Sequence, residues 1–289
     1  MHDFRARSRP FKQVDVFTEV PFKGNPVAVV LDGDGLSTTQ MQSIASWTNL
    51  SETTFVCAPR HADADYRLRI FTPKTELPFA GHPTIGSAWA VLEGGLTPKN
   101  TELLCQECEK GLITVRIAGE KFFLALPEPA FTTPDEVELA AAVAGLGIRA
   151  DAIENASVVD VGAVWLTLQL RSAPEVLAVE PRMDLLAALG GGLVGVTVFG
   201  LHDPGDPTAI EVRSFAPADG VPEDPVCGSG NGCVAALIRR HGVLGVRDYV
   251  ASQGRCLGRD GRVDVEYGSD GTIWVGGYAV TCIDGSIRV

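Results

Sequence analysis

Short apolar segments separated by glycine- and proline-rich turns run through most of the chain. A capping-box pattern at Ser37 and Gln40 opens one helix, and a second helix, expected to end near Gly94, carries almost no charge. An apolar surface on all sides indicates that this second helix is buried. Runs of apolar or alternating side chains predict strands. In the first half they cover residues 11–17, 27–31, 53–57 and 66–71, with a hairpin formed by 111–117 and 121–126.

The second half of the chain repeats this plan. A capping box over residues 133–136 opens an alanine-rich helix that runs to about Gly145. A glycine-rich loop over 224–232 leads into an apolar helix, 233–238, followed by basic residues and Gly242. Strands are expected at 157–161, 164–170, 194–199 and 209–215, with a hairpin turn at Asp270-Gly271 between 265–267 and 272–275.

The two halves can be aligned directly. At a constant offset, Arg69, Phe71, Pro73 and Pro78 match Arg213, Phe215, Pro217 and Pro222. After a two-residue gap, His82, Pro83, Gly86 and Ser87 match Asp224, Pro225, Gly228 and Ser229. The matches keep the same order within one short window, so chance agreement of turn residues is the weaker explanation. The sequence therefore predicts two related lobes with a cleft between them.

Composition and charge narrow the function classes. The chain has 289 residues, of which 45% are hydrophobic and 21% charged, so it is globular rather than disordered. The formal net charge of −12 disfavours nucleic-acid binding, because an acidic surface repels phosphate. No segment has the ~20 apolar residues of a membrane helix. Residues 1–10 lack the apolar core of a signal peptide, and the seven cysteines are an odd number. We therefore expect a reduced, cytoplasmic protein without a membrane partner.

Cysteine spacing gives no metal site. Cys105 and Cys108 form a single CxxC, and no second Cys or His pair lies near them in the sequence. A zinc site usually needs such a second pair. We interpret the two cysteines as residues at the end of a strand.

Each glycine-rich loop leads into a helix N-terminus, where free backbone N–H groups bind anions. These glycines could hold a small carboxylate, or they could only allow tight packing of two buried helices. Glu52 precedes a strand, where desolvation would raise its pKa and suit it to proton transfer; the alternative is an exposed loop glutamate. His82 and Asp224 could contact a substrate, or be a helix cap and a turn aspartate. Cys227 could be an activated thiolate or a small packing residue.

Four segments resemble the PhzF-like phenazine-biosynthesis isomerase family, part of the diaminopimelate epimerase superfamily. They are FKQVDVFTEVPFKGNPVAVV, NLSETTFV, RIFTPKTELPFAGHPTIGSA and VRSFAPADGVPEDPVCGSG. A weaker similarity continues from Gln253-Gly254 to Gly276-Gly277. The resemblance implies an α/β fold of two pseudo-symmetric lobes, each a curled, mostly antiparallel sheet around a central apolar helix. It implies an N-terminal lobe of residues 1–127 joined by the C-terminal strand 278–289, a C-terminal lobe of 128–277, and an active site in the cleft between them.

The resemblance also assigns roles to individual residues. Glu52 falls on the general acid/base of the family, and His82 and Asp224 on residues that contact the substrate. The implied reaction is a cofactor-independent isomerisation of a small amino or hydroxy carboxylate, such as trans-2,3-dihydro-3-hydroxyanthranilate. Glu52 would move a proton along one face of the substrate. The other implied substrate-binding residues are Asn25, Gly81, Gly228 and Ser229.

One departure leaves the reaction open. Cys227 stands where the phenazine enzymes carry a small hydroxyl residue, and it resembles one thiol of the two-cysteine epimerases and racemases. Residues 79–87 hold no matching thiol, which disfavours a two-cysteine reaction. An epimerase using Glu52 and Cys227 as two bases remains an alternative, as does a non-catalytic binding protein with the same fold. Family analogy alone predicts a homodimer.

Overall fold

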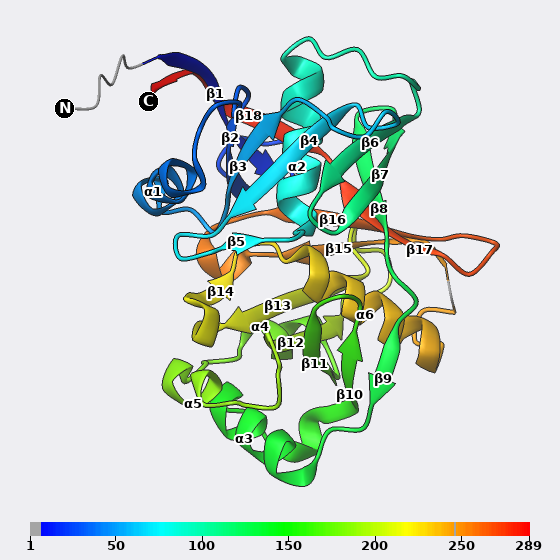
Figure 1. The fold of residues 1–289 in the computed structure, drawn as a ribbon. Coiled ribbons are helices and arrows are strands. Elements are labelled where there is room, and N and C mark those ends of the chain that lie inside the picture. The colour runs from blue at the N-terminus through cyan, green and yellow to red at the C-terminus, as the bar shows by residue number, and fades with distance from the viewer. Residues whose placement is uncertain (1–6, 246) are drawn as a thin grey trace. The chain divides into compact units, whose positions relative to one another are not determined.

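The computed structural model describes residues 7–245 and 247–289. Residues 1–6, which belong to the polar N-terminus considered above, lie outside the described residues. The chain divides into two compact units (Figure 1). Unit 1 contains the described residues up to Leu124 together with Tyr278–Val289, and unit 2 is Ala125–Gly277.

Unit 1 is a mixed sheet in which neighbouring strands are mostly antiparallel. Along the sheet the strands follow the order β18-β1-β2-β3-β4-β6-β7-β8, and β5 pairs beside β4. The β2–β3 and β4–β6 pairs are parallel and the others antiparallel. The strands are β1 (Ser8–Val16), β2 (Asn25–Val30), β3 (Thr53–Cys57), β4 (Tyr66–Phe71), β5 (Glu76–Leu77), β6 (Leu103–Cys108), β7 (Gly111–Ala118), β8 (Lys121–Ala125) and β18 (Ala279–Arg288).

Unit 2 repeats this topology strand for strand. Its order is β9-β10-β11-β12-β13-β15-β16-β17, with β14 beside β13, and the β11–β12 and β13–β15 pairs are parallel. The repeat inferred from the sequence is therefore confirmed in the pairing pattern. The strands are β9 (Ala130–Thr132), β10 (Ile153–Asp160), β11 (Val164–Leu170), β12 (Gly195–Leu201), β13 (Ile210–Ala216), β14 (Val221–Asp224), β15 (Tyr249–Gln253), β16 (Gly261–Tyr267) and β17 (Ile273–Gly277).

Each unit packs its sheet against one central helix. Helix α2 (Gly81–Glu93) contacts β1, β2, β3, β4 and β18, and α6 (Gly228–His241) contacts β10, β11, β12, β16 and β17. Most residues of both helices are buried, as the nearly uncharged sequence of α2 predicted for that helix. The remaining helices are α1 (Thr38–Thr48), α3 (Glu136–Leu146), α4 (Ala173–Leu177), α5 (Met183–Ala187), η1 (Ala150–Ala152), η2 (Pro217–Asp219) and η3 (Arg255–Leu257).

The repeat extends to side-chain contacts. In unit 1, Arg69 donates two hydrogen bonds to the carboxylate of Glu76, both 2.7 Å long. In unit 2, Arg213 donates two to Glu223, both 2.9 Å long. Each guanidinium also lies over the phenylalanine two residues later, Phe71 or Phe215. The R-x-F motif therefore forms the same bidentate ion pair in both units, between a strand and the short strand that returns beside it.

Two local expectations are wrong. The predicted capping box over residues 133–136 does not form, because α3 begins later and Asp135 caps it by accepting from the N–H of Glu138. The segment 228–232, expected to be part of a loop, is the first turn and a half of α6. Glycine weakens a helix in isolation, but here burial against the sheet outweighs that propensity. By contrast, the capping box of Ser37 and Gln40 forms as predicted.

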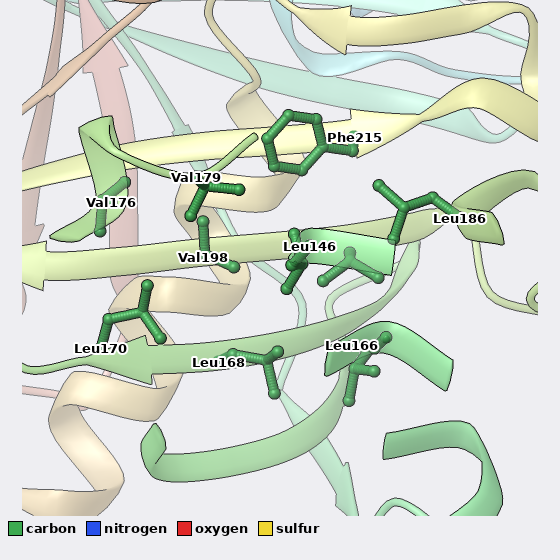
Figure 2. Packing of buried hydrophobic residues seen from close by; sticks show 11 residues of the cluster. Leu146, Leu166, Leu168, Leu170, Val176, Val179, Leu186, Val198 and Phe215 are labelled. Carbon is green, nitrogen blue, oxygen red and sulfur yellow. The ribbon is translucent and has the colours of Figure 1, made fainter. Parts of the chain in front are cut away.

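One hydrophobic cluster of unit 2 lies between its sheet and helices α3, α4 and α5 (Figure 2). Leu168 on β11 is fully buried among the apolar side chains of this cluster. Neighbours from several elements surround it, so a void there would be difficult to close. The fully or nearly buried members are Ala142, Leu146, Leu166, Leu168, Leu170, Val176, Val179, Leu186, Val196, Val198 and Phe215.

We expect Leu168→Ala to lower the free energy of unfolding by about 2–5 kcal/mol, because the substitution removes buried apolar atoms and leaves a cavity. Denaturation with urea measures the change. Val137→Ala on α3 is the control, since Val137 is 79% exposed. Its effect is expected to stay within about 0.5 kcal/mol. A similar loss in the two variants would contradict this assignment of the core.

Candidate functional site

In unit 1, the predicted site residues lie at the ends of two strands and the start of the central helix. Asn25 is the first residue of β2 and is fully buried. Glu52 immediately precedes β3, and its carbonyl accepts from the N–H of Ala28 at 3.4 Å. Gly81 and His82 are the first two residues of α2. Because β2 and β3 pair in parallel, Asn25 at the start of β2 and Glu52 just before β3 lie at the same end of two neighbouring strands.

A direct hydroxyl contact ties β3 to α2. The Thr54 and Ser87 hydroxyl oxygens are 2.8 Å apart, and both side chains are fully buried. This contact joins a strand residue two positions after Glu52 to the second turn of α2, whose first turn contains His82. It accounts for the proximity of two side chains that are thirty positions apart in the sequence.

Glu52 and His82 are adjacent. Glu52 Oε2 lies 3.4 Å from His82 Nε2, and the two side chains are 15% and 8% exposed. Glu52 is therefore a largely buried carboxyl group and not the exposed loop glutamate of the alternative interpretation. Burial lowers the pKa of His82 to about 3, against a weaker opposing effect of its hydrogen bond with the Pro26 backbone. His82 is thus a neutral imidazole at neutral pH, and its contact with Glu52 is not an ion pair.

The glycines of these helices fall into two groups. A Cβ on Gly86 would lie 2.4 Å from a methyl carbon of Val27, and one on Gly230 would lie 2.5 Å from the Ser214 hydroxyl. These two glycines are required by packing. Among the residues that the structure describes, a Cβ on Gly81 would meet only Leu124, at 3.8 Å. Packing within unit 1 therefore does not explain Gly81, which leaves its predicted role at the substrate open.

In unit 2, the predicted residues lie on the segment that connects β14 to α6. Asp224 ends β14, and its Oδ1 accepts from the N–H of Val226 at 3.0 Å. Cys227 is the N-cap of α6, with Sγ accepting from the N–H of Gly230 at 3.3 Å. Gly228 and Ser229 follow as the first residues of the helix. The segment thus places a carboxyl, a thiol and a hydroxyl group within six residues.

Burial controls the protonation of this segment. It raises the pKa of Asp224 to about 6, although hydrogen bonds from the Cys227 thiol and the Val226 N–H favour the carboxylate. Burial, reinforced by the nearby Asp224 charge, also raises the pKa of the Cys227 thiol well above its ordinary value. Cys227 is therefore a protonated thiol and not the activated thiolate considered from the sequence. The helix N-terminus is insufficient to offset desolvation of the charged sulfur.

We expect Asp224→Asn to stabilise the protein above pH 6 and to lose this advantage as the pH falls toward 4. An acid whose folded-state pKa is raised contributes stability below its ordinary pKa and loses that contribution as the pH rises through the folded value, here about 6. Asparagine is uncharged throughout and keeps an oxygen for the Val226 N–H. Melting temperatures of the variant and the wild type between pH 4 and 8 measure the difference.

Asp160→Asn is the matched control for this prediction. Asp160 is exposed and accepts the same kind of turn hydrogen bond, from the N–H of Gly162 at 2.7 Å. A constant melting difference across the pH range for Asp224→Asn would contradict the burial argument.

Sequence reasoning missed several residues of the unit 2 site. The indole N–H of Trp165, on β11, donates to the Ser229 hydroxyl at 3.0 Å. The buried side chains of Asn231 and Gln253 hydrogen-bond to the segment that carries Asp224 and Cys227. The repeat identified Arg213 but not its partner Glu223. Apart from the bond of Asn231 to the Cys227 carbonyl within the first turn of α6, these contacts join residues that are ten or more positions apart, so no local pattern signals them.

Cys105 and Cys108 lie in β6, which ends at Cys108, as the strand interpretation predicted. All cysteines of the described residues are free. Within residues 7–245 and 247–289, no cluster of three or more His, Cys, Asp or Glu side chains has the arrangement of a metal site. No helix of this described part combines the length and hydropathy that crossing a membrane requires.

Comparison with known proteins identifies the family. The family described as "Phenazine biosynthesis-like protein" matches residues 14–285. The chain belongs to this family. A protein from Schizosaccharomyces pombe named "Antisense-enhancing sequence 1" is 44% identical over 95% of this chain and 97% of its own length. The trans-2,3-dihydro-3-hydroxyanthranilate isomerase of Pseudomonas chlororaphis is 36% identical over 80% of each chain.

A solved structure from the same family confirms that this chain has the fold of the family. A Bacillus anthracis phenazine biosynthesis protein of the PhzF family has a solved structure with a TM-score of 0.85, covering 98% of this chain and 100% of its own. At 23% identity this likeness establishes the shared fold. With named isomerases among the relatives, family membership supports an isomerase or epimerase activity for the chain. The resemblance drawn from the sequence motifs is confirmed, while the roles of individual residues stay predictions.

Proposed function

We propose that this phenazine biosynthesis-like protein catalyses a cofactor-independent isomerisation of a small amino or hydroxy carboxylate, with Glu52 as the acid/base. The observation that carries the proposal is the pair formed by Glu52 and His82, whose carboxyl and imidazole groups lie 3.4 Å apart in a largely buried setting. A carboxylate beside a neutral imidazole is suited to accept a proton and to return it. The substrate class is supported by the named isomerase of Pseudomonas chlororaphis.

The proposed reaction moves one proton. Glu52, as carboxylate, takes a proton from a carbon that a neighbouring π-system activates, and the electron pair of the C–H bond enters that π-system. The double bonds shift, and protonated Glu52 returns the proton to a different carbon on the same face. His82 contacts Glu52 as a neutral imidazole. Atoms and electrons balance without any external oxidant or reductant.

The remaining predicted residues would bind the substrate. We propose that Asp224 and His82 contact its amino and hydroxyl groups, and that Gly81, Gly228 and Ser229 hold its carboxylate at the helix N-termini. Asn25 would lie beside the same substrate. The indole of Trp165 can only donate, so its bond occupies a lone pair of the Ser229 oxygen. Cys227 Sγ lies 3.6 Å from the same oxygen, so the thiol and the substrate carboxylate would share the Ser229 hydroxyl.

Proton NMR in D₂O with trans-2,3-dihydro-3-hydroxyanthranilate tests the reaction. Conversion with one deuterium incorporated at a specific carbon of the product would support the isomerisation. Conversion without deuterium in the product would indicate that the proton on Glu52 does not exchange with solvent before Glu52 returns it to the substrate. If this substrate is not converted while other small amino or hydroxy carboxylates exchange a C–H proton, the reaction type stands and this substrate is excluded.

Cys227 supports a second candidate function, an epimerisation that uses Glu52 as base and Cys227 as acid. The observation in favour is the protonation state: Cys227 is a neutral thiol that can donate a proton, whereas a thiolate could not. Inverted configuration at the exchanging carbon, lost in Cys227→Ser, would favour epimerisation. Retained configuration with an active Cys227→Ser variant would favour the one-base isomerisation.

The assembly state remains a prediction. By family analogy we propose a homodimer, with a cytoplasmic location. Light scattering should then give about twice the chain mass of 30.6 kDa, and a value near the chain mass would contradict the dimer.

A further inference from the structure

A buried glutamine hydrogen-bonds to both ends of the segment that carries Asp224 and Cys227. Gln253 is the last residue of β15 and is 1% exposed. Its Nε2 donates to the backbone carbonyl of Asp224 at 2.9 Å. Its Oε1 accepts from the backbone N–H of Cys227 at 3.1 Å. One side chain therefore fixes the spacing between the two residues.

Asn231 and two close backbone approaches reinforce this arrangement. Asn231 Nδ2 donates to Gln253 Oε1 at 2.8 Å and to the Cys227 carbonyl at 2.9 Å. A Cβ on Gly254 would lie 2.5 Å from the Pro225 carbonyl oxygen, and one on Gly261 would lie 2.4 Å from a methyl carbon of Val226. Pro225 and Val226, in the middle of the segment, thus pack closely against glycines that follow Gln253. The side-chain amide of Gln253 hydrogen-bonds to the two ends of the segment, Asp224 and Cys227.

We propose that Gln253 is a positioning residue that sets the geometry of Asp224 and Cys227 for the reaction. This role rests on the proposed function of Asp224 as a substrate-contacting residue. An amide is required because the site needs a donor at one end and an acceptor at the other. Methionine, similar in length, provides no N–H donor and only a weak sulfur acceptor.

Unit 1 contains a comparable device at a different position. Gln106 on β6 is fully buried, accepts from the Tyr66 hydroxyl at 2.9 Å and donates to the Thr84 hydroxyl at 3.1 Å. Thr84 in turn donates to the Ala80 carbonyl, in the first turn of α2. Gln106 lies on the strand that pairs in parallel with β4, and Gln253 lies on the strand that pairs in parallel with β13. In each unit the hydrogen bonds of this buried glutamine extend to the start of the central helix. The two glutamines occupy different register positions, so they are not copies of one repeated residue.

Alkylation of Cys227 by iodoacetamide tests the positioning without any substrate. The reaction is followed by peptide mass spectrometry, and exposed Cys256 on η3 provides an internal reference in the same molecule. We expect Gln253→Met to raise the Cys227 rate relative to Cys256 by about tenfold, because loss of these hydrogen bonds loosens the segment.

Gln169→Met is the matched control. Gln169 is also a buried glutamine in unit 2 with two side-chain hydrogen bonds, to Glu154 and Asn155 on β10. These contacts do not involve the Asp224 segment. Equal alkylation rates in Gln253→Met and Gln169→Met would overturn the proposal, because a general loss of stability would then explain both.

Gln253→Glu adds a readout that a purely structural role would not move. A protonated glutamic acid at this position restores both a donor and an acceptor, whereas its carboxylate has no donor for the Asp224 carbonyl. We expect the ratio of variant to wild-type kcat/KM to rise as the pH falls. A ratio independent of pH would overturn the positioning role. If the wild type shows no turnover at all, the proposed function fails while the alkylation comparison still decides the role of Gln253.

Discussion

Glu52→Gln is expected to lower turnover by about 10²–10⁴-fold, the usual effect of removing a general acid/base. Glutamine has nearly the same shape as glutamate and can keep the 3.4 Å contact with His82. It cannot accept a proton from carbon. The variant should therefore keep its fold and lose deuterium incorporation from D₂O into the product, measured by proton NMR alongside the wild type.

Glu109→Gln provides the control for this substitution. Glu109 is exposed in unit 1, and its neutralisation changes the net charge by the same amount. Its turnover should stay within about twofold of the wild type, since isolated surface substitutions have small effects. A Glu52→Gln variant that turns over substrate as fast as Glu109→Gln would remove Glu52 from the mechanism. Absence of turnover in the wild type, together with ligand affinity that is unchanged in Glu52→Gln, would favour a binding protein with this fold.

Arg213→Met is expected to lower the free energy of unfolding by about 3–5 kcal/mol, because it leaves a buried carboxylate without its cation. Arg213 is 4% exposed, donates two hydrogen bonds to Glu223, and also donates to the carbonyls of Val176 and Val179. Methionine fills part of the volume and makes none of these bonds. Urea denaturation measures the loss.

The internal repeat supplies the control, Arg69→Met. The ion pair of Arg69 with Glu76 has the same bidentate geometry, but its side chains are 20% and 28% exposed. Water can therefore solvate the remaining carboxylate, and we expect a loss of about 1 kcal/mol. Comparable losses in the two variants would show that burial does not determine the strength of this pair.

The local elements could be predicted from the sequence because their signals are local. The strand at 53–57 and the capping box of Ser37 and Gln40 are found as expected. The sequence predicts a loop where the first turn of α6 lies, since its glycines disfavour a helix until the surrounding sheet buries them. The family resemblance indicates Glu52 and His82 as site residues, but their contact could not be predicted, because it depends on the parallel pairing of β2 with β3 and on the Thr54–Ser87 contact.

The sequence by itself determined the α/β class, the repeated unit and the family, since these depend on periodicity and on motifs that can be read along the chain. Only the tertiary structure decided the protonation states of His82, Asp224 and Cys227. Desolvation sets each of these pKa values, and it depends on everything that packs around the group. The same reason explains Gln253: its hydrogen bonds exist only because the pairing of β13 with β15 brings it beside residues more than twenty positions earlier in the chain.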